Sequence, residues 1–186
     1  MNTATKSLLA ALVILNVVGC ASTVNRNTSN FKETSTVKEE VVQVVKFMPL
    51  KNLTVTLNSD AQKKLADNEE FSRDKLYEKI NSMLLNSEYL QPQNNNSNLK
   101  LEIQITDFRV RSGAAAILLG FLAGADTIVG QVYVKDNEKV LDNFEVSISY
   151  AFGGFAGGDT DTRMNWMYES FSNKILGELK KLMPKG

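Results

Sequence analysis

The sequence predicts an α+β fold, a two-layer sandwich in which a four- to five-stranded mixed or antiparallel sheet carries two long helices on one face. Two segments, 72–87 and 160–183, place apolar side chains at helical spacing along one side. Three further segments, which start at Leu99, Asp126 and Lys139, alternate apolar and polar side chains as half-buried strands do. One layer of helices on one sheet is the simplest arrangement that buries all of these faces.

The N-terminus carries a secretory signal. Lys6 supplies a charged start, residues 7–18 are almost wholly apolar, and Gly19 precedes Cys20, the only cysteine of the chain. A cysteine directly after the cleavage point resembles the lipobox of bacterial lipoproteins, so residues 1–19 are expected to be removed and Cys20 to be acylated. The apolar run of about a dozen residues is too short for a transmembrane helix. In such lipoproteins Ala21, in place of an aspartate, favours the outer membrane, with the domain facing the periplasm.

Residues 20–36 are predicted to be a flexible tether between the lipid and a single folded domain at 37–186. The tether is polar and has almost no side chains that form a core. An interaction segment with Phe31 as its apolar contact is the alternative. Within 37–50 many residues are β-branched, which indicates the first strand. A short second strand is expected where apolar and polar residues alternate, at Leu53, Val55 and Leu57.

Two long helices and one short helix are predicted around the strands. Residues 59–62 read Ser-Asp-Ala-Gln, which fits a capping box with Ser59 at the cap of the short helix. The first long helix, 72–87, has its apolar stripe at Leu76, Ile80, Met83 and Leu84. The second, 160–183, ends before Pro184. Its stripe is formed by Met164, Met167, Phe171, Ile175, Leu179 and Leu182.

The strand that starts at Leu99 changes phase along its length. Its first half places Leu101, Ile103 and Ile105 on one face, whereas past Thr106 the apolar residues are Phe108 and Val110. In a regular strand, this change of phase would turn the apolar side chains of the second half toward solvent. The pattern therefore predicts a β-bulge near Thr106 and Asp107, which adds one residue and keeps both halves on the core face.

The segments 126–135 and 139–152 flank the turn signal Asp136-Asn137-Glu138 and predict a β-hairpin. With the turn at Asn137 and Glu138, paired positions of the antiparallel strands sum to about 275, which places Asp126 opposite Ser149.

Two glycine-rich stretches lie at the end of the hairpin opposite its turn. Residues 113–125 are uncharged, and residues 153–158 hold four glycines. The first stretch is interpreted as a loop over the core, as a short helix that packs through Gly120 and Gly124 and mediates assembly, or as a membrane-inserting element. We hypothesise that this end forms an apolar contact surface, made by Leu118, Leu119, Phe121, Leu122 and Phe155. The alternative is that the last helix covers these side chains.

The composition excludes several kinds of chemistry. The chain has no histidine and one cysteine, so the commonest general base and metal ligand is absent and no thiol remains once Cys20 is acylated. With 21 basic and 21 acidic residues, no excess of positive charge favours nucleic acid. Asp159 and Asp161 are interpreted as helix caps rather than as a metal or phosphate loop. Trp166 is expected to pack on its helix. No catalytic residue, metal or cofactor is predicted.

From Leu99 to its end the chain resembles a family of bacterial lipoproteins known only as a domain of unknown function. The likeness lies in Thr106-Asp107-Phe108 after a strand, in the Gly/Ala-rich residues 119–125, in the hairpin around 132–141, and in the long helix that follows. The resemblance implies the fold and the lipid anchor and implies no activity.

The function expected from these features is that of a lipid-anchored, non-enzymatic protein of the cell envelope that binds or scaffolds another envelope component. Its partners would be the membrane, through the acyl group on Cys20, and an envelope protein. The second hypothesis is a subunit of an oligomeric lipoprotein assembly for export or envelope structure, built through the Gly/Ala-rich segment. A third is a hydrolase without a recognisable motif, which a serine–lysine dyad or a carboxylate pair would require.

Overall fold

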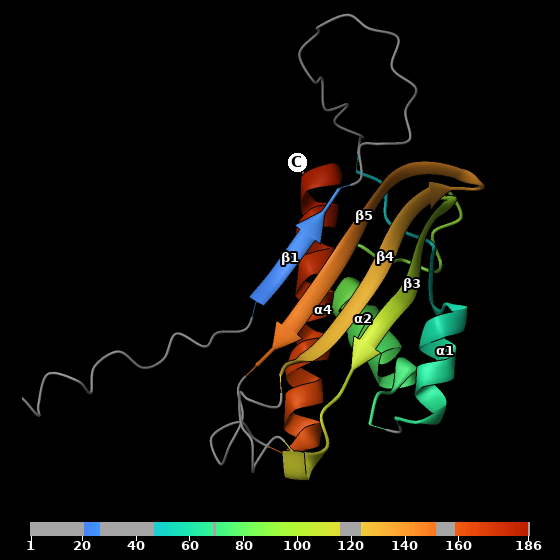
Figure 1. The fold of residues 1–186 in the computed structure, drawn as a ribbon. Helices are drawn as coiled ribbons and strands as arrows, with labels where there is room; N and C mark the ends of the chain where they lie inside the picture. Colours follow the sequence, from blue (N-terminus) through green and yellow to red (C-terminus); the bar gives the residue numbers. More distant parts are fainter. Residues whose placement is uncertain (1–20, 27–46, 69, 116–123, 152–158, 186) are drawn as a thin grey trace, which may run out of the picture.

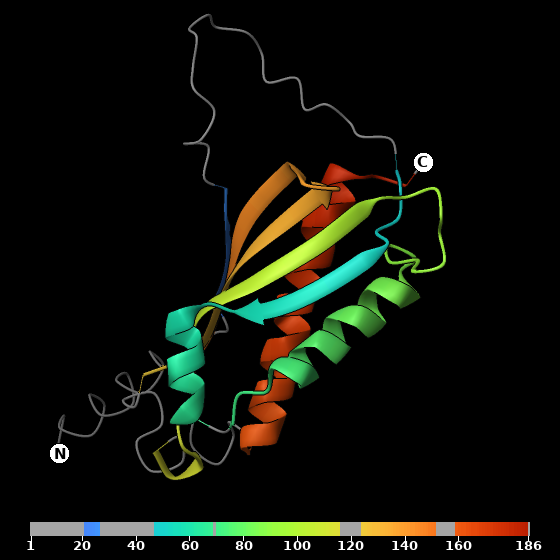
Figure 2. The same ribbon diagram turned by 90° about the vertical axis from the view of Figure 1, so that its right-hand side faces the viewer.

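The computed structural model describes residues 21–26, 47–68, 70–115, 124–151 and 159–185. A five-stranded mixed sheet in the order β1-β5-β4-β3-β2 forms one layer, and helices form the other (Figure 1). The strands are β1 (Ala21–Asn25), β2 (Asn52–Leu57), β3 (Leu99–Arg109), β4 (Asp126–Asp136) and β5 (Lys139–Tyr150). The helices are α1 (Ser59–Ala66), α2 (Arg73–Asn86) and α4 (Thr160–Leu182). This confirms the predicted α+β class and the two long helices on one face (Figure 2).

The core lies between the inner face of the sheet and the two long helices. Both predicted helical stripes face it, although Met83 and Leu182 are only half-buried. Gly130, in the middle of β4, lets a helix side chain approach closely, because a Cβ there would stand 2.9 Å from Cζ of Phe171. The aromatic rings of Phe71 and Phe108 stack with centroids 4.2 Å apart and close the core beside α2.

Two irregularities set the register of the sheet. The register of β3 against β4 shifts between Ile105 and Asp107, which confirms the predicted bulge. The hairpin turns where predicted, but a second shift between Val134 and Lys135 adds one residue on β5. Asp126 therefore lies opposite Tyr150, and the predicted pairing with Ser149 is wrong by one position.

Side chains that cap the helices fix where they begin. Ser72 and Asp159 cap α2 and α4, and their oxygens accept hydrogen bonds from backbone N–H groups of the first turn. The predicted cap of α1, Ser59, is wrong by one position. Asn58, rather than Ser59, holds this position, because its Oδ1 accepts a hydrogen bond from the N–H of Ala61 at 2.8 Å.

Residues 21–25 form an edge strand, so the prediction of a flexible tether is wrong for this part of 20–36. β1 pairs antiparallel with β5, and the half-buried side chain of Val24 packs against the core. Arg26 then fastens the strand to two other elements. Its guanidinium lies 2.6 Å from a carboxylate oxygen of Asp142 on β5 and 2.6 Å from one of Glu178 on α4. Pairing and ion pairs thus make residues 21–26 part of the domain.

The strand predicted within 37–50 falls mostly outside the described residues, which resume at Phe47. In the described part, Leu50 forms a single bridge to Leu90 before β2 begins. The second predicted strand is confirmed as β2, which pairs in parallel with β3.

Candidate interaction site

One end of the sheet gathers the termini of five elements, and we call it the glycine-rich end. There β3 and β5 end, β4, α4 and β1 begin, and the chain leaves for segments 116–123 and 152–158 (Figure 1). We call the described residues that flank these two segments their roots. The pairing of Asp126 with Tyr150 brings the root that follows the first segment next to the root that precedes the second, as the hairpin geometry predicts. The segments themselves lie outside the described residues. With them lie all five predicted contact residues, Leu118, Leu119, Phe121, Leu122 and Phe155.

A buried ionic cluster of Arg111, Asp126 and Arg163 lies next to this end. Asp126 receives three hydrogen bonds from Arg111, from its backbone N–H at 2.7 Å, its Nε at 3.2 Å and its guanidinium at 3.0 Å. Nε of Arg163 lies 3.1 Å from the second carboxylate oxygen. The three side chains are at most 1% exposed. Because two buried guanidinium groups face one buried carboxylate, removal of this carboxylate would take a charge partner from each of them.

The cluster also holds the backbone on both sides of the two segments. The guanidinium of Arg111 donates to the carbonyl oxygen of Gly124 at 2.9 Å and to that of Tyr150 at 3.2 Å. Arg163 donates to the carbonyl oxygen of Arg111 at 2.9 Å and so ties the start of α4 to the end of β3. The roots of both glycine-rich segments are therefore fixed to one rigid base.

Gly124 is required at its position. Its φ of +82° lies in the left-handed region, and a Cβ there would stand 2.7 Å from the guanidinium of Arg109. The root of the first segment thus depends on a residue without a side chain.

Sequence reasoning missed this cluster, although one signal was present. Arg163 stands four residues before Met167 and eight before Phe171, so it continues the buried stripe of α4 as a charged residue. The interpretation of this region as a helix cap names only the neighbouring Asp159 and Asp161. Asp159 does cap the helix, and the hydrogen bond from the backbone of Thr162 lowers the pKa of its carboxyl group.

Cys20, the predicted lipidation site, is bonded to Ala21, a residue of the glycine-rich end. Cys20 lies outside the described residues, but Ala21 is the first residue of β1 and lies opposite Ser149, one residue before the end of β5. An acyl group on Cys20 would therefore be attached beside the roots of both glycine-rich segments.

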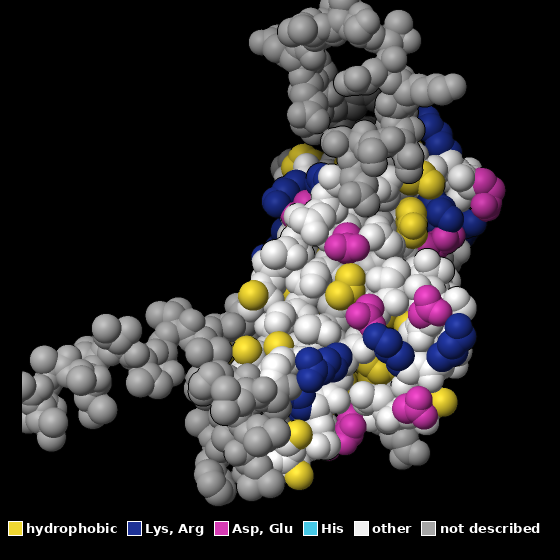
Figure 3. Space-filling model, in the orientation of Figure 1, with side chains coloured by type: hydrophobic (Ala, Val, Ile, Leu, Met, Phe, Trp, Pro, Cys, Tyr) yellow, Lys and Arg dark blue, Asp and Glu magenta, His cyan; other side chains and the backbone are white. Residues whose placement is uncertain are grey.

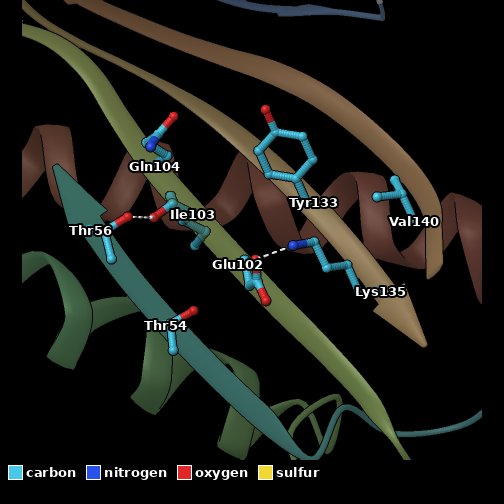
Figure 4. A pocket seen from close by; sticks show the side chains of 8 residues that line it. All are labelled: Thr54, Thr56, Glu102, Ile103, Gln104, Tyr133, Lys135 and Val140. Carbon is cyan, nitrogen blue, oxygen red and sulfur yellow. Dashed lines mark hydrogen bonds and ion pairs between the residues drawn. The ribbon is translucent and has the colours of Figure 1, made fainter. Parts of the chain in front are cut away.

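The outer face of the sheet offers a second, polar hollow of about 360 Å³ (Figure 4). Its walls include Thr54, Thr56, Gln104 and Tyr133 together with an ion pair between Glu102 and Lys135. The hydrogen bond that the amine of Lys135 donates to the carboxylate of Glu102 raises the pKa of Lys135. Apolar side chains on this face are scattered among polar and charged ones (Figure 3), which is typical of a solvated surface.

Within the described ranges, no group of three or more acidic or cysteine side chains is arranged to hold a metal ion. No helix among them is long and apolar enough to span a bilayer.

The sequence matches the model of a family described as a domain of unknown function (DUF4410) over residues 27–154. The match starts well before Leu99 and ends before α4, so the resemblance expected for the C-terminal half extends over a different range. Two solved structures are similar, a PelC dodecamer from Paraburkholderia phytofirmans at 7% identity and TM-score 0.45, and a single-substitution variant of it at 12% and 0.39. Each match covers 89% of this chain and 100% of the other. At these TM-scores they carry no inference. The comparison with curated proteins finds no match.

Proposed function

The chain belongs to the family of the domain of unknown function DUF4410, and from its own structure we propose that it is a lipid-anchored, non-enzymatic scaffold of the bacterial cell envelope. In this proposal, Cys20 carries the acyl group at the outer membrane, the domain faces the periplasm, and the glycine-rich end binds another envelope component. The alternative use of the same end is self-association into an oligomeric lipoprotein assembly.

The observation that supports this proposal most is the convergence of three features at one end of the sheet. The residue next to Cys20 pairs beside the end of β5, and the roots of both glycine-rich segments lie there as well. Both segments consist of apolar residues and glycine only. The buried cluster behind them provides a rigid base, which reduces the conformational entropy that binding must overcome.

A non-enzymatic role is supported by the absence of histidine from the sequence and by the ion pair that Lys135 forms with Glu102. Without histidine, a hydrolase would need a serine–lysine or carboxylate pair. In the polar hollow of the outer face, the amine of Lys135 is held protonated by Glu102. That arrangement disfavours the lysine as a general base.

The proposal is tested by changing Leu119 and Phe121 together to Asp in the anchored chain. If these side chains contact a partner, charged replacements should abolish its co-purification from detergent-solubilised envelope while the unfolding midpoint stays unchanged, because desolvating a carboxylate in an apolar interface is costly. Val140→Asp is the matched control, since Val140 is a 42% exposed apolar residue near the hairpin turn.

The outcomes separate the candidate roles. Loss of partner with the double variant and retention with Val140→Asp support the contact surface. Global unfolding of the double variant means that these residues belong to the core, and the contact surface is then wrong. If the purified wild-type chain elutes as an oligomer and the double variant as a monomer, the segment serves self-association instead.

A further inference from the structure

The chain exposes its single tryptophan. Trp166 lies in the second turn of α4 and is 56% exposed, whereas the other exposed large hydrophobic residues of the described ranges are 37–42% exposed. Its ring meets that of Tyr150 edge to face, with centroids 5.8 Å apart at 72°. The sequence predicts that Trp166 packs on its helix, whereas its aromatic partner in the structure is Tyr150, at the end of β5. More than half of a large apolar ring faces outward beside a second aromatic ring.

The aromatic pair lies at the same corner of the molecule as the start of β1. Tyr150 directly follows Ser149, which lies opposite Ala21 in the pairing of β5 with β1. Paired strands are about 4.8 Å apart, and consecutive Cα atoms about 3.8 Å apart. Cys20 is bonded to Ala21, so its Cα is about 3.8 Å from that of Ala21, the residue at which the strand paired with β5 begins.

We propose that Trp166 and Tyr150 contact the phospholipid surface beside the acylated Cys20. This inference rests on the proposed lipid anchor and adds a surface that would fix how the domain lies on the membrane. Tryptophan and tyrosine suit this position because each has an apolar ring and one polar group, and both are enriched where bilayers meet water. A second membrane contact adds buried apolar surface to that of the acyl chains on Cys20 and so strengthens anchoring.

The contact depends on apolar burial rather than on charge. The chain has equal numbers of basic and acidic residues, and Glu169, one turn along α4 from Trp166, is exposed. Attraction to anionic lipids, which requires clusters of Lys and Arg, is not expected here. Vesicles of phosphatidylcholine, a zwitterionic lipid without net charge, are therefore the appropriate probe.

Because Trp166 is the only tryptophan, its fluorescence reports on this site alone. The acylated chain, purified from membranes, is added to phosphatidylcholine vesicles with and without bromine-labelled acyl chains. We expect the emission to shift to shorter wavelength on binding and to lose most of its intensity with the brominated lipid. Sedimentation with the vesicles, measured on the same samples, tests the acyl anchor separately.

The control moves the only tryptophan to the other end of the hairpin, in the double variant Trp166→Phe with Val140→Trp. This reporter lies beside the hairpin turn and should show neither shift nor quenching. A chain that sediments with vesicles while Trp166 stays unshifted and unquenched overturns the inference and leaves the anchor intact. A chain that does not sediment contradicts both. A shift that requires an added envelope protein and does not occur with lipid alone assigns the aromatic pair to a protein partner and also overturns it.

Discussion

Asp126→Asn should lower the free energy of unfolding by about 3–5 kcal/mol, the cost of removing one partner from a buried ion pair. Asp126 is fully buried and is the charge partner of Arg111 and Arg163. The amide of asparagine has nearly the same shape but no charge, and its NH2 group would face a guanidinium. Since domains are stable by only about 5–15 kcal/mol, this change approaches global unfolding.

Urea unfolding of the wild type and the variant measures this effect through the midpoint and slope. Asp161→Asn is the matched control, because the side chain of Asp161 is 88% exposed and forms an ion pair with the exposed Lys75. Exposed ion pairs contribute about 0–1 kcal/mol, so this control should stay near the wild type. A loss below about 1 kcal/mol for Asp126→Asn would show that the cluster does not hold the glycine-rich end together.

Cys20→Ser should abolish membrane attachment. If the acyl chains hold the domain, each buried methylene contributes about 0.8 kcal/mol, and a serine at the cleavage point can carry no thioether-linked lipid. We expect the variant to accumulate as uncleaved precursor or to appear outside the outer-membrane fraction, as measured by fractionation and by incorporation of a labelled fatty acid. Ser22→Ala, two residues further on, is the control and should be labelled and localised as the wild type. Equal fatty-acid labelling of Cys20→Ser would contradict the anchor.

The apolar part of the fold was predictable from the sequence, because periodicity records which faces are buried. The stripes of α2 and α4 and the phase change at Thr106 follow from that periodicity, and the structure confirms them. The second irregularity had a signal too, since Asp142 interrupts the alternation of β5 beside the register shift. Counting back from the turn without the extra residue on β5 gives a pairing that is wrong by one residue.

Features that depend on polar contacts between distant residues were not predictable in this way. β1 is short and polar, and it is stable because it pairs with β5 and because Arg26 meets Asp142 and Glu178. Nothing in the sequence around residues 21–26 indicates that Asp142 and Glu178 are the partners of Arg26. Arg111 alternates with the apolar Phe108 and Val110, a pattern typical of the polar side of a strand, whereas Asp126 from β4 makes its burial possible.

We propose that an acyl group on Cys20 anchors this domain at the glycine-rich end. Mass spectrometry of the N-terminal peptide of the chain isolated from the outer-membrane fraction tests it most directly. We expect a peptide that begins at Cys20 and carries the mass of acyl chains, followed by Ala21 and the rest of β1. A peptide that still contains residues 1–19, or that begins elsewhere without added lipid mass, would contradict it.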